Sequence, residues 1–489
     1  MNRVLLSFIC ALTLVSCASE RDESITLQSE DDIAGLRVAT ISGGCYDIDL
    51  SSRNDITLQR YNAPSEALQS LISGKTDVVV YDEIVYNSTI RKENGVKIAL
   101  LGERGFPTAF LFPKENAELA EACSAMQRRM VEDGSMQKLK DFWLTDRYAE
   151  VGTFTHIPND GTGEPIRVVT AGSTAPISFQ VVDDWFGIEI DLLRELGKEL
   201  NRPLEIKSFD PASGLLAIKT GLADVLCGCV FITPEREQEF LFSEPYHSYR
   251  AAYFVKDRSF KKEEQSLVSW FKNSVRKNLI AENRWKFITE GIWETIRISL
   301  LSILFGTILG IGLYLMTISR RRWVRSCARV YKSFMAGIPQ LVLLLILFYL
   351  VFARSGVPTH IVAAITFALF FASGVCDIYH TSLDAVPRGQ TEAGLALGFT
   401  RAQTFFHIVF PQALRRGLPL YQGQCISILK GTSIVGYIAI HDLTKAGDLI
   451  RSRTFDAFLP LLIVTVLYFI LARIIIALLK LATPKKNVL

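Results

Sequence analysis

The pattern of apolar residues divides the chain into two halves. Between residues 20 and 290, apolar residues occur in short groups separated by polar and charged residues, whereas residues 295–480 contain most of the long apolar runs. Short groups are typical of the strands and helices of a soluble α/β domain, and long runs are typical of helices that cross a membrane. The pattern therefore predicts a soluble half followed by a membrane half.

Five long apolar stretches follow Trp293. Most of them approach the roughly 20 residues that a helix needs to cross a bilayer. The fourth is the weakest and contains Lys430, so it either crosses the membrane or forms a buried or re-entrant segment. We expect it to cross, because small and polar residues suit a helix packed inside a bundle. The stretches are Ile298–Ile318, Phe334–Phe352, Ile361–Ile378, Leu418–Ile440 and Phe458–Leu479.

Basic residues in the connecting segments predict the orientation. If there are five crossings, three basic segments lie on the same side: the Arg-rich loop from Arg320 to Lys332, the segment from Arg388 to Arg416, and the tail with Lys485 and Lys486. The excess of Lys and Arg on the inner side of membranes makes that side cytoplasmic. The polar half then lies outside the cytoplasm.

The N-terminus has the form of a secretory signal. Arg3 precedes an apolar run from Val4 to Val15 that is short for a membrane span. The sequence Leu14-Val15-Ser16-Cys17 resembles a lipobox, the site at which bacterial lipoproteins are cleaved and acylated on Cys. We expect lipidation at Cys17; the alternative is an uncleaved anchor with an incidental Cys.

The soluble half predicts α/β units with largely parallel sheets. Thr233-Pro234-Glu235 has the features of a helix start, with a hydroxyl N-cap, Pro at the first position and an acid in the first turn. The segments Gly74–Val78 and Gly221–Val225 echo each other and suggest two related lobes. Predicted strands are Gly35–Ile41, Asp77–Tyr81, Ile166–Ala171, Leu204–Phe209, Asp224–Val230 and Tyr249–Val255; predicted helices are Ser65–Ser73, a pair between Asn116 and Leu144, one along Ile188–Leu200 and one near Leu215.

Composition narrows the function classes. The net charge of +3 over 489 residues gives no nucleic-acid signal. The chain has nine cysteines, but no spacing predicts a disulfide pairing, and Cys227-x-Cys229 alone is weak support for a metal site. No phosphate-binding loop, catalytic triad or metal cluster is recognisable. We therefore expect no cofactor and no enzymatic activity in this chain.

The stretch from Glu392 to Pro411 reads EAGLALGFTRAQTFFHIVFP. It resembles the EAA loop of ABC-importer permeases, with Gly394 in place of the second Ala. The resemblance implies a short helix that docks into the ATPase subunit. It extends over about 200 residues through the motifs TSLDAVPRGQTEAGLALGF, FPQALRRGLP and ILKGTSIVGYIAI. The coupling residues that it implies are Glu392, Ala393, Gly394, Gly398 and Phe399.

The soluble half resembles the periplasmic binding proteins for polar amino acids. Residues 164–257 look like their first lobe, through RVVTAGSTAPISF, FGIEIDLLRELGKEL, GLADVLCGCVFITPERE and FSEPY. Residues 32–147 look like their second lobe and C-terminal helices, through IAGLRVATISGG, ALQSLISGKTDVVVYDE and DGSMQKLKDFW. In the family the first lobe comes first, so the order here is reversed.

We interpret the reversed order as a circular permutation within one chain, which is tolerated where termini lie close together on a surface. The alternative is two truncated domains that pair between protomers. The expected organisation is a signal or lipoprotein-type segment over 1–17, lobe two with the C-terminal helices over 23–147, a linker over 148–165, lobe one over 166–258, a linker over 259–290 and a permease of about five helices over 291–482.

The resemblance implies a ligand site between the lobes. In the family, an Arg after the TPE-like turn binds the ligand carboxylate and an Asp of lobe two binds the ammonium; Arg236 and Asp82 occupy these positions. Gly43 and Gly44 match the loop whose backbone N–H groups meet the carboxylate. Solvated or capping roles are the alternatives for these residues, and a cation in the first turn of a helix, like Arg236, is unfavourable without another use.

The pocket departs from the family pattern along its walls. The family's aromatic positions are Thr174 and Ile177, a family acid is Ala171, and the backbone and hydroxyl contacts before the TPER turn fall on Cys229 and Phe231. The pocket therefore keeps the two charged residues of the family, Arg236 and Asp82, but not the family's residues between them. We expect either a ligand that is unusual for the family or weakened binding.

We therefore expect an α/β two-lobed binding domain followed by an all-α membrane domain. The expected function is the binding and permease subunit of an ABC importer for amino acids or related polar solutes. Its expected partners are a separate ATPase and a second permease copy, or a related permease in a heterodimer. The alternative is a ligand-gated receptor, or a solute sensor derived from a transporter. A receptor channel predicts a pore loop and no ATPase-docking loop, which is the opposite of this sequence.

Overall fold

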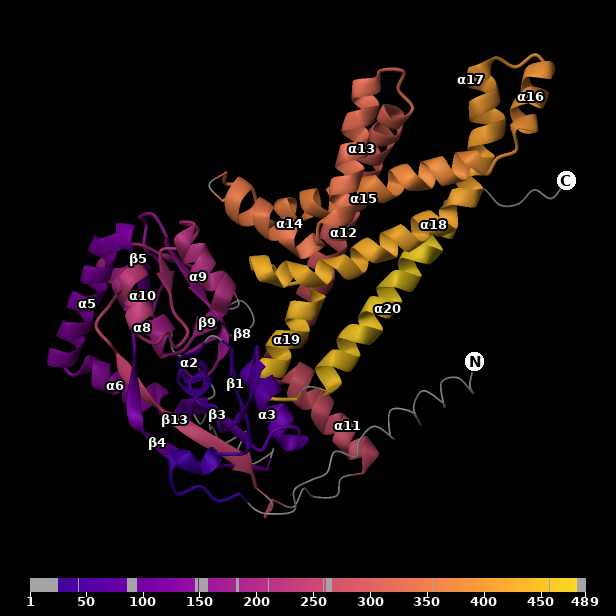
Figure 1. Ribbon diagram of the computed structural model, residues 1–489. Coiled ribbons are helices and arrows are strands. Elements are labelled where there is room, and N and C mark those ends of the chain that lie inside the picture. The colour runs from indigo at the N-terminus through magenta and orange to yellow at the C-terminus, as the bar shows by residue number, and fades with distance from the viewer. Residues whose placement is uncertain are drawn as a thin grey trace. The chain divides into compact units, whose positions relative to one another are not determined.

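The computed structural model describes residues 25–42, 44–85, 95–145, 148, 157–181, 184–209, 211–257, 259–260, 266–353, 355–456 and 458–481. The expected signal segment over 1–17, with Cys17, and residues 149–156 of the expected linker over 148–165 lie outside these residues. Two compact units make up the chain (Figure 1). The first comprises Met1–Lys219, Ala223–Glu282 and Leu449–Leu459; the second comprises Thr220–Leu222, Asn283–Asp448 and Pro460–Leu489.

The first sheet of the first unit has five strands in the order β2-β1-β3-β13-β4. β1 pairs in parallel with β2 and β3, and β13 pairs antiparallel with β3 and β4. Helices α2 (Cys45–Ser51) and α3 (Pro64–Ile72) follow β1 and β2. The strands are β1 (Arg37–Ile41), β2 (Thr57–Tyr61), β3 (Val78–Asp82), β4 (Val96–Thr108) and β13 (His247–Lys256).

The second sheet also has five strands, in the order β10-β6-β11-β5-β12. Its core includes the fully buried Leu192 and the indole of Trp143, whose N–H donates to the carboxylate of Asp191 at 2.7 Å. The strands are β5 (Leu111–Pro113), β6 (Ile166–Thr170), β10 (Leu204–Ser208), β11 (Val225–Leu226) and β12 (Phe240–Phe242), and the helices α5 (Ala117–Glu132), α6 (Ser135–Trp143), α8 (Ile188–Glu199), α9 (Pro211–Lys219) and α10 (Pro234–Glu239).

Each half of the soluble segment contributes to both sheets. β5, from the first half, pairs with β11 and β12 of the second sheet, and α5 and α6 pack into the core of that sheet. β13, from the second half, pairs with β3 and β4 of the first sheet. The chain therefore passes between the sheets twice, after β4 and before β13. Sequence patterning predicted the strand Tyr249–Val255 but not its partners, because pairing depends on residues far along the chain.

The echo between Gly74–Val78 and Gly221–Val225 has a structural counterpart. In the first sheet, Arg37 donates to Asp77 from its backbone N–H at 2.9 Å and its guanidinium at 2.7 Å. In the second sheet, Arg167 donates to Asp224 in the same way at 2.9 and 2.6 Å. Each aspartate precedes the strand that pairs in parallel with the strand of its arginine. The two sheets thus repeat one local arrangement.

The predicted strand Asp224–Val230 is much shorter than expected, since β11 covers only Val225–Leu226. Two residues further on, Gly228 and Cys229 have φ of +111° and +61°. A strand requires negative φ, so the chain leaves the sheet there. A small sheet that the patterning missed joins β7 (Ser173–Thr174), β8 (Ser178–Val181) and β9 (Asp184–Phe186).

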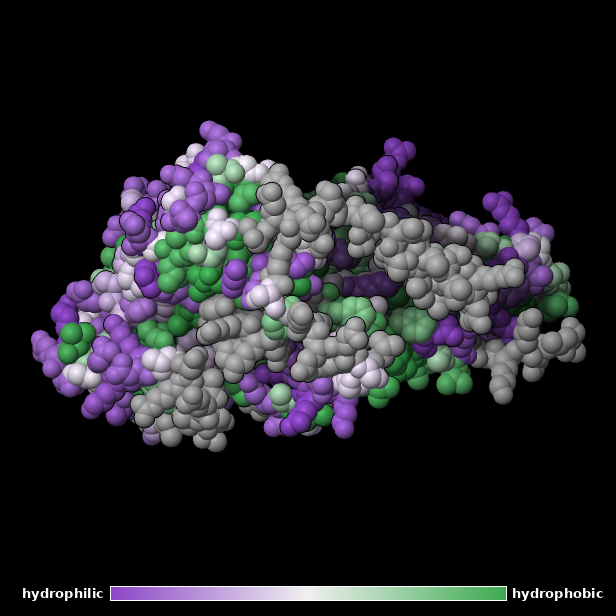
Figure 2. All heavy atoms as spheres, turned by 90° about the horizontal axis from the view of Figure 1, so that it is seen from below, coloured by the Kyte–Doolittle hydropathy of each residue, from purple (hydrophilic) through white to green (hydrophobic). Residues whose placement is uncertain are grey.

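Hydrophilic residues predominate at the left of Figure 2, where the first unit lies.

The second unit is helical. α12 (Trp285–Thr317), α15 (Thr359–Asp384) and α20 (Phe458–Leu481) are each long and apolar enough to cross a membrane. Within the described residues there are three such helices, or as many as five candidate spans if each of two bent helix pairs counts as one. Gly306 and Gly310 allow α12 to pack closely on α15. A Cβ at Gly306 would lie 2.8 Å from Phe371, and a Cβ at Gly310 would lie 2.7 Å from Val375. Small residues at helix contacts are typical of membrane bundles.

The second predicted stretch, Phe334–Phe352, is not one straight helix. α13 (Arg322–Gly337) and the segment Gln340–Val351, which begins with α14 (Gln340–Ile346), meet at an angle of 107°. Between them, Ile338 has φ −96° and ψ 133°. Proline disfavours helical geometry in the residue before it, and Pro339 therefore breaks the helix. The fourth stretch lies in the other bent pair, which joins Arg401–Ile438 and Leu443–Thr454 at 53°.

Candidate functional site

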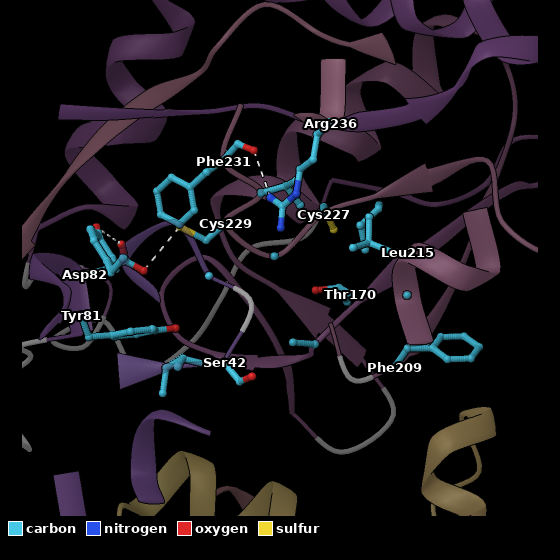
Figure 3. A pocket seen from close by; sticks show the side chains of 18 of the residues that line it. Ser42, Tyr81, Asp82, Thr170, Phe209, Leu215, Cys227, Cys229, Phe231 and Arg236 are labelled. Atoms are coloured by element: carbon cyan, nitrogen blue, oxygen red, sulfur yellow. Dashed lines mark hydrogen bonds between the residues drawn. The ribbon is translucent and has the colours of Figure 1, made fainter. Parts of the chain in front are cut away.

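A cavity of about 120 Å³ in the first unit is lined by residues from both sheets and the segments that follow them. Asp82 ends β3 of the first sheet, and Arg236 belongs to α10, between β11 and β12. Figure 3 shows their side chains approaching the cavity from different sides. Uncharged residues form much of the remaining lining, among them Tyr46, Tyr81, Thr170, Phe209, Leu215, Cys227, Cys229 and Phe231.

Asp82 is a buried carboxylate with two donors. Its side chain is almost fully enclosed, with 1% of the residue exposed. The Tyr46 hydroxyl donates to one carboxylate oxygen at 2.6 Å, and the Cys229 thiol lies 3.6 Å from the other (Figure 3). Burial raises the pKa of Asp82 to about 6, although the hydrogen bonds from Tyr46 and Cys229 oppose the rise. A cationic group in the cavity would stabilise the charged carboxylate.

Arg236 is a half-buried cation held by local contacts. Thr233 caps α10 as expected, with its hydroxyl accepting from the backbone N–H of Arg236 at 3.4 Å. The guanidinium donates to the carbonyl oxygen of Phe231 at 3.1 Å. Burial lowers the pKa of Arg236. An anionic group bound beside this guanidinium would therefore be favoured by both charge and geometry.

Some of the other predicted ligand residues line the cavity and others do not. Gly44, Cys229 and Phe231 line the cavity, whereas Gly43 lies outside the described residues. Thr174 is not among the described residues that line the cavity; its side chain hydrogen-bonds to Tyr81, which is a lining residue.

Tyr46 is a lining residue that the sequence analysis did not single out, and it belongs to an aromatic cluster. The rings of Tyr46 and Phe231 lie edge to face with centroids 5.7 Å apart, and Phe106 packs on Tyr46 at 5.1 Å. Phe231, which replaces a family hydroxyl position, is thus part of an aromatic cluster. Tyr46 follows Gly44 at the start of α2, but nothing in its neighbourhood in the sequence indicates that it reaches Asp82.

The predicted coupling residues form a compact helical turn. α16 (Arg388–Ala396) and α17 (Arg401–Thr404) are joined at Gly398, which has φ +85°. The Gly394 that replaces the family's second Ala is buried, and a Cβ there would come within 2.6 Å of Thr404 and 2.9 Å of Ile408. The expected single helix is therefore two short helices packed on each other, and the glycine permits that packing.

The outer side of this turn is exposed. Glu392 and Ala393 of α16 are exposed, and Leu397 and Phe399 expose 77% and 41% of their surfaces. Thr400 begins α17 with a capping box, in which Gln403 donates its backbone N–H to the Thr400 hydroxyl at 3.3 Å. The turn thus presents an acid and apolar side chains on a well-defined scaffold.

Among the described residues, no group of three or more His, Cys, Asp or Glu is arranged to hold a metal ion.

Two protein-family models match the chain. Residues 166–290 match the bacterial extracellular solute-binding proteins, family 3. Residues 302–487 match the binding-protein-dependent transport system inner membrane component.

Curated proteins match the membrane half. The chain is 34% identical over 187 residues to the L-cystine transport system permease protein TcyB of Bacillus subtilis, covering 38% of this chain and 80% of that protein. It is 30% identical over 197 residues to the probable amino-acid ABC transporter permease protein YckA of the same organism, covering 40% and 87%. A solved structure of an amino acid ABC transporter with histidines is 28% identical, covers 45% of this chain and 97% of that chain, and has a TM-score of 0.38.

Proposed function

The chain belongs to the binding-protein-dependent inner-membrane components of ABC transport systems, and from that premise we propose that its own binding domain captures an amino acid and delivers it to its own permease. It joins the binding-protein and permease components of an amino-acid ABC importer in one multi-pass inner-membrane protein. Its role is transport without chemical catalysis. Its family works with a separate ATPase, which supplies the energy.

The observation that carries the proposal is the presence of Arg236 and Asp82 in one cavity. An amino acid is a zwitterion, and the two side chains complement its carboxylate and its ammonium. Charge-assisted hydrogen bonds of this kind contribute roughly 1.5–3 kcal/mol each. Asp82 ends a strand of the first sheet, and Arg236 lies on α10, between two strands of the second sheet. A ligand that contacts both therefore favours the closed arrangement of the lobes.

The binding domain is completed within one chain by circular permutation. Lobe two with the C-terminal helices corresponds to residues 23–147 and lobe one to 166–258. The pairing of β5 with β11 and of β13 with β3 supports this organisation, because each segment supplies a strand to the other's sheet. A fused domain also presents its solute to the permease at high effective concentration.

The turn formed by α16 and α17 docks the ATPase. Its exposed face carries Glu392, Leu397 and Phe399, which offers both charge and apolar area to a partner. Two permease copies form the pore, as a homodimer or with a related permease.

Acylation of Cys17 would add an N-terminal anchor, and metabolic labelling with palmitate, compared with Cys17→Ala, tests it.

Calorimetric titration of the purified full chain with a panel of amino acids tests the binding role. The panel includes L-cystine and L-glutamine, because permeases named for these solutes are among the relatives. Arg236→Ala should weaken binding by about 2–5 kcal/mol, since it leaves the ligand carboxylate unpaired.

Arg128→Ala is the matched control. Arg128 forms surface ion pairs with Glu121 and Glu244, so its loss should leave affinity unchanged. A folded wild-type chain that binds no member of the panel would contradict the proposal, as would equal effects of the two variants.

A solute sensor derived from a transporter is the second candidate. It is favoured by the Tyr46 hydroxyl and the Cys229 thiol, which already occupy both oxygens of Asp82. ATP hydrolysis by the chain with its ATPase in proteoliposomes separates the candidates. Transport predicts solute-stimulated hydrolysis and uptake, and a sensor predicts solute binding without uptake.

A further inference from the structure

Glu189, the second residue of α8, is a carboxylate with no exposed surface. One of its oxygens accepts the backbone N–H of Gly228 at 2.6 Å. The other accepts the backbone N–H of Cys229 at 2.9 Å and the hydroxyl of Tyr246 at 2.6 Å. Burial raises the pKa of Glu189, and these hydrogen bonds oppose the rise. The sequence analysis did not single out this residue.

The two amides that Glu189 accepts belong to an unusual piece of backbone. Gly228 and Cys229 both have positive φ, at +111° and +61°. The second value is costly for a residue with a Cβ, so the surrounding contacts must hold it. This conformation carries the Cys229 thiol toward Asp82, at 3.6 Å. The loop from Cys227 to Phe231, called the cavity loop here, lines the cavity along its whole length.

The third donor to Glu189 lies where the chain passes between the sheets. Tyr246 directly precedes β13, its backbone N–H donates to the carbonyl of Thr108 at 3.1 Å, and its ring stacks on Phe110 with centroids 5.5 Å apart. Thr108 and Phe110 belong to the other passage between the sheets, from β4 to β5. Tyr246 therefore contacts both passages, and Glu189 joins them to the cavity loop.

We infer that Glu189 is a positioning residue: it holds the cavity loop in its binding conformation and couples that loop to the two passages between the sheets. The inference rests on the proposed function, because it concerns the same cavity. Glu189 acts through the cavity loop and is not among the described residues that line the cavity. A carboxylate is required because three donors converge on it, and only an acceptor-only group satisfies all three.

The same helix supplies a matched control. Asp191 is also a buried carboxylate of α8, with 6% of its surface exposed. It accepts from the indole of Trp143 and thereby holds α6 in the core of the second sheet. Glu189→Gln and Asp191→Asn are both isosteric losses of a buried charge. Glu189 accepts hydrogen bonds from the cavity loop, whereas Asp191 accepts from Trp143 and pairs with Arg194 at 3.8 Å.

Hydrogen exchange of the full chain in detergent, read by mass spectrometry, tests the inference without a ligand. In Glu189→Gln, an amide NH₂ faces backbone N–H donors, and exchange of the peptide over 226–232 should be about tenfold faster or more. In Asp191→Asn, faster exchange should fall on α6 and leave that peptide within about twofold of wild type. Tyr246→Phe keeps the ring and removes one donor, so exchange of the loop should rise less.

Titration with L-glutamine and L-cystine provides the second readout. Glu189→Gln should weaken the affinity for whichever amino acid wild type binds by about tenfold, and Asp191→Asn should leave it within about twofold. Equal effects of the two variants on the cavity loop would overturn the inference, as would unchanged exchange in Glu189→Gln. If Glu189→Gln does not fold, Tyr246→Phe decides: faster exchange of the cavity loop supports the inference, and unchanged exchange overturns it. Failure of wild type to bind either amino acid would count against the proposed function alone, and the exchange result would still decide the role of Glu189.

Discussion

The cavity and the turn formed by α16 and α17, called the coupling turn here after its proposed role, are built in opposite ways. The cavity unites Asp82 and Cys229, which hydrogen-bond although 147 positions separate them in the chain. The coupling turn packs Gly394 on Thr404 and Ile408 within one short stretch. The polar groups of the cavity are largely buried, whereas Glu392 and Leu397 of the turn are exposed. A site formed by residues close together in the sequence can be recognised from the spacing of its motif. In a site assembled by the fold, the uncharged lining residues can differ from the family pattern while the two charged residues are kept.

The strongest way to separate the two sites is to crowd the coupling turn. Gly394→Leu places a side chain where Thr404 lies within 2.6 Å of a Cβ, so α16 and α17 must move apart. Solute-stimulated ATP hydrolysis by the reconstituted complex should fall about tenfold or more, and solute affinity should stay unchanged. Gly389→Ala on the same helix is the control, because its Cβ meets nothing within 4 Å. Weakened solute binding in Gly394→Leu would show that the sites are not independent.

A second variant acts on the cavity and spares the turn. Asp82→Asn removes the charge that faces the ligand ammonium and should weaken amino-acid binding by about 2–5 kcal/mol. Since the pKa of Asp82 is about 6 without ligand, wild-type affinity should rise as pH increases through 6. Titrations at several pH values should show that rise in wild type and its absence in the variant. A pH-independent wild type would exclude Asp82 as the ammonium partner.

The third and smallest expected effect is a difference between two aspartates of the binding domain, Asp82 and Asp224, in how each changes stability with pH. The folded pKa of Asp82, about 6, exceeds its ordinary value of 3.8. The stability that its proton contributes is therefore fully present below pH 3.8 and is lost as pH rises through 6. Asp82→Asn should stabilise the ligand-free chain above pH 6, by at most about 3 kcal/mol.

Asp224 should behave in the opposite sense. Burial alone would raise its pKa, but the hydrogen bonds from Arg167 outweigh burial and lower it below 3.8. Its contribution to stability is present above that value and is lost as pH falls through the lowered pKa. Asp224→Asn should therefore destabilise the chain at neutral pH, by about 1.5–3 kcal/mol. Thermal unfolding of both variants between pH 4 and 8 measures the difference, and shifts of the same sign would refute it.

The sequence by itself determined the features that depend on neighbouring residues. The motif from Glu392 to Pro411 indicated the helical segment that contains α16 and α17. Thr233-Pro234-Glu235 indicated the start of α10, and the long apolar runs indicated a helical membrane half. The break before Pro339 had a local signal that the hydropathy pattern alone did not use. These features are predictable because capping, proline geometry and hydrophobic periodicity act over a few residues.

The tertiary structure alone decided which distant residues meet. It paired β5 and β13 with strands of the other half, brought the Tyr46 hydroxyl to Asp82, and placed Glu189 under the cavity loop. No local pattern distinguishes Glu189 from Asp191, two positions further on in the same helix. The physical reason is that strand partners, burial and hydrogen-bond donors are properties of the packed fold, and they give each carboxylate its role only after the chain has closed around it.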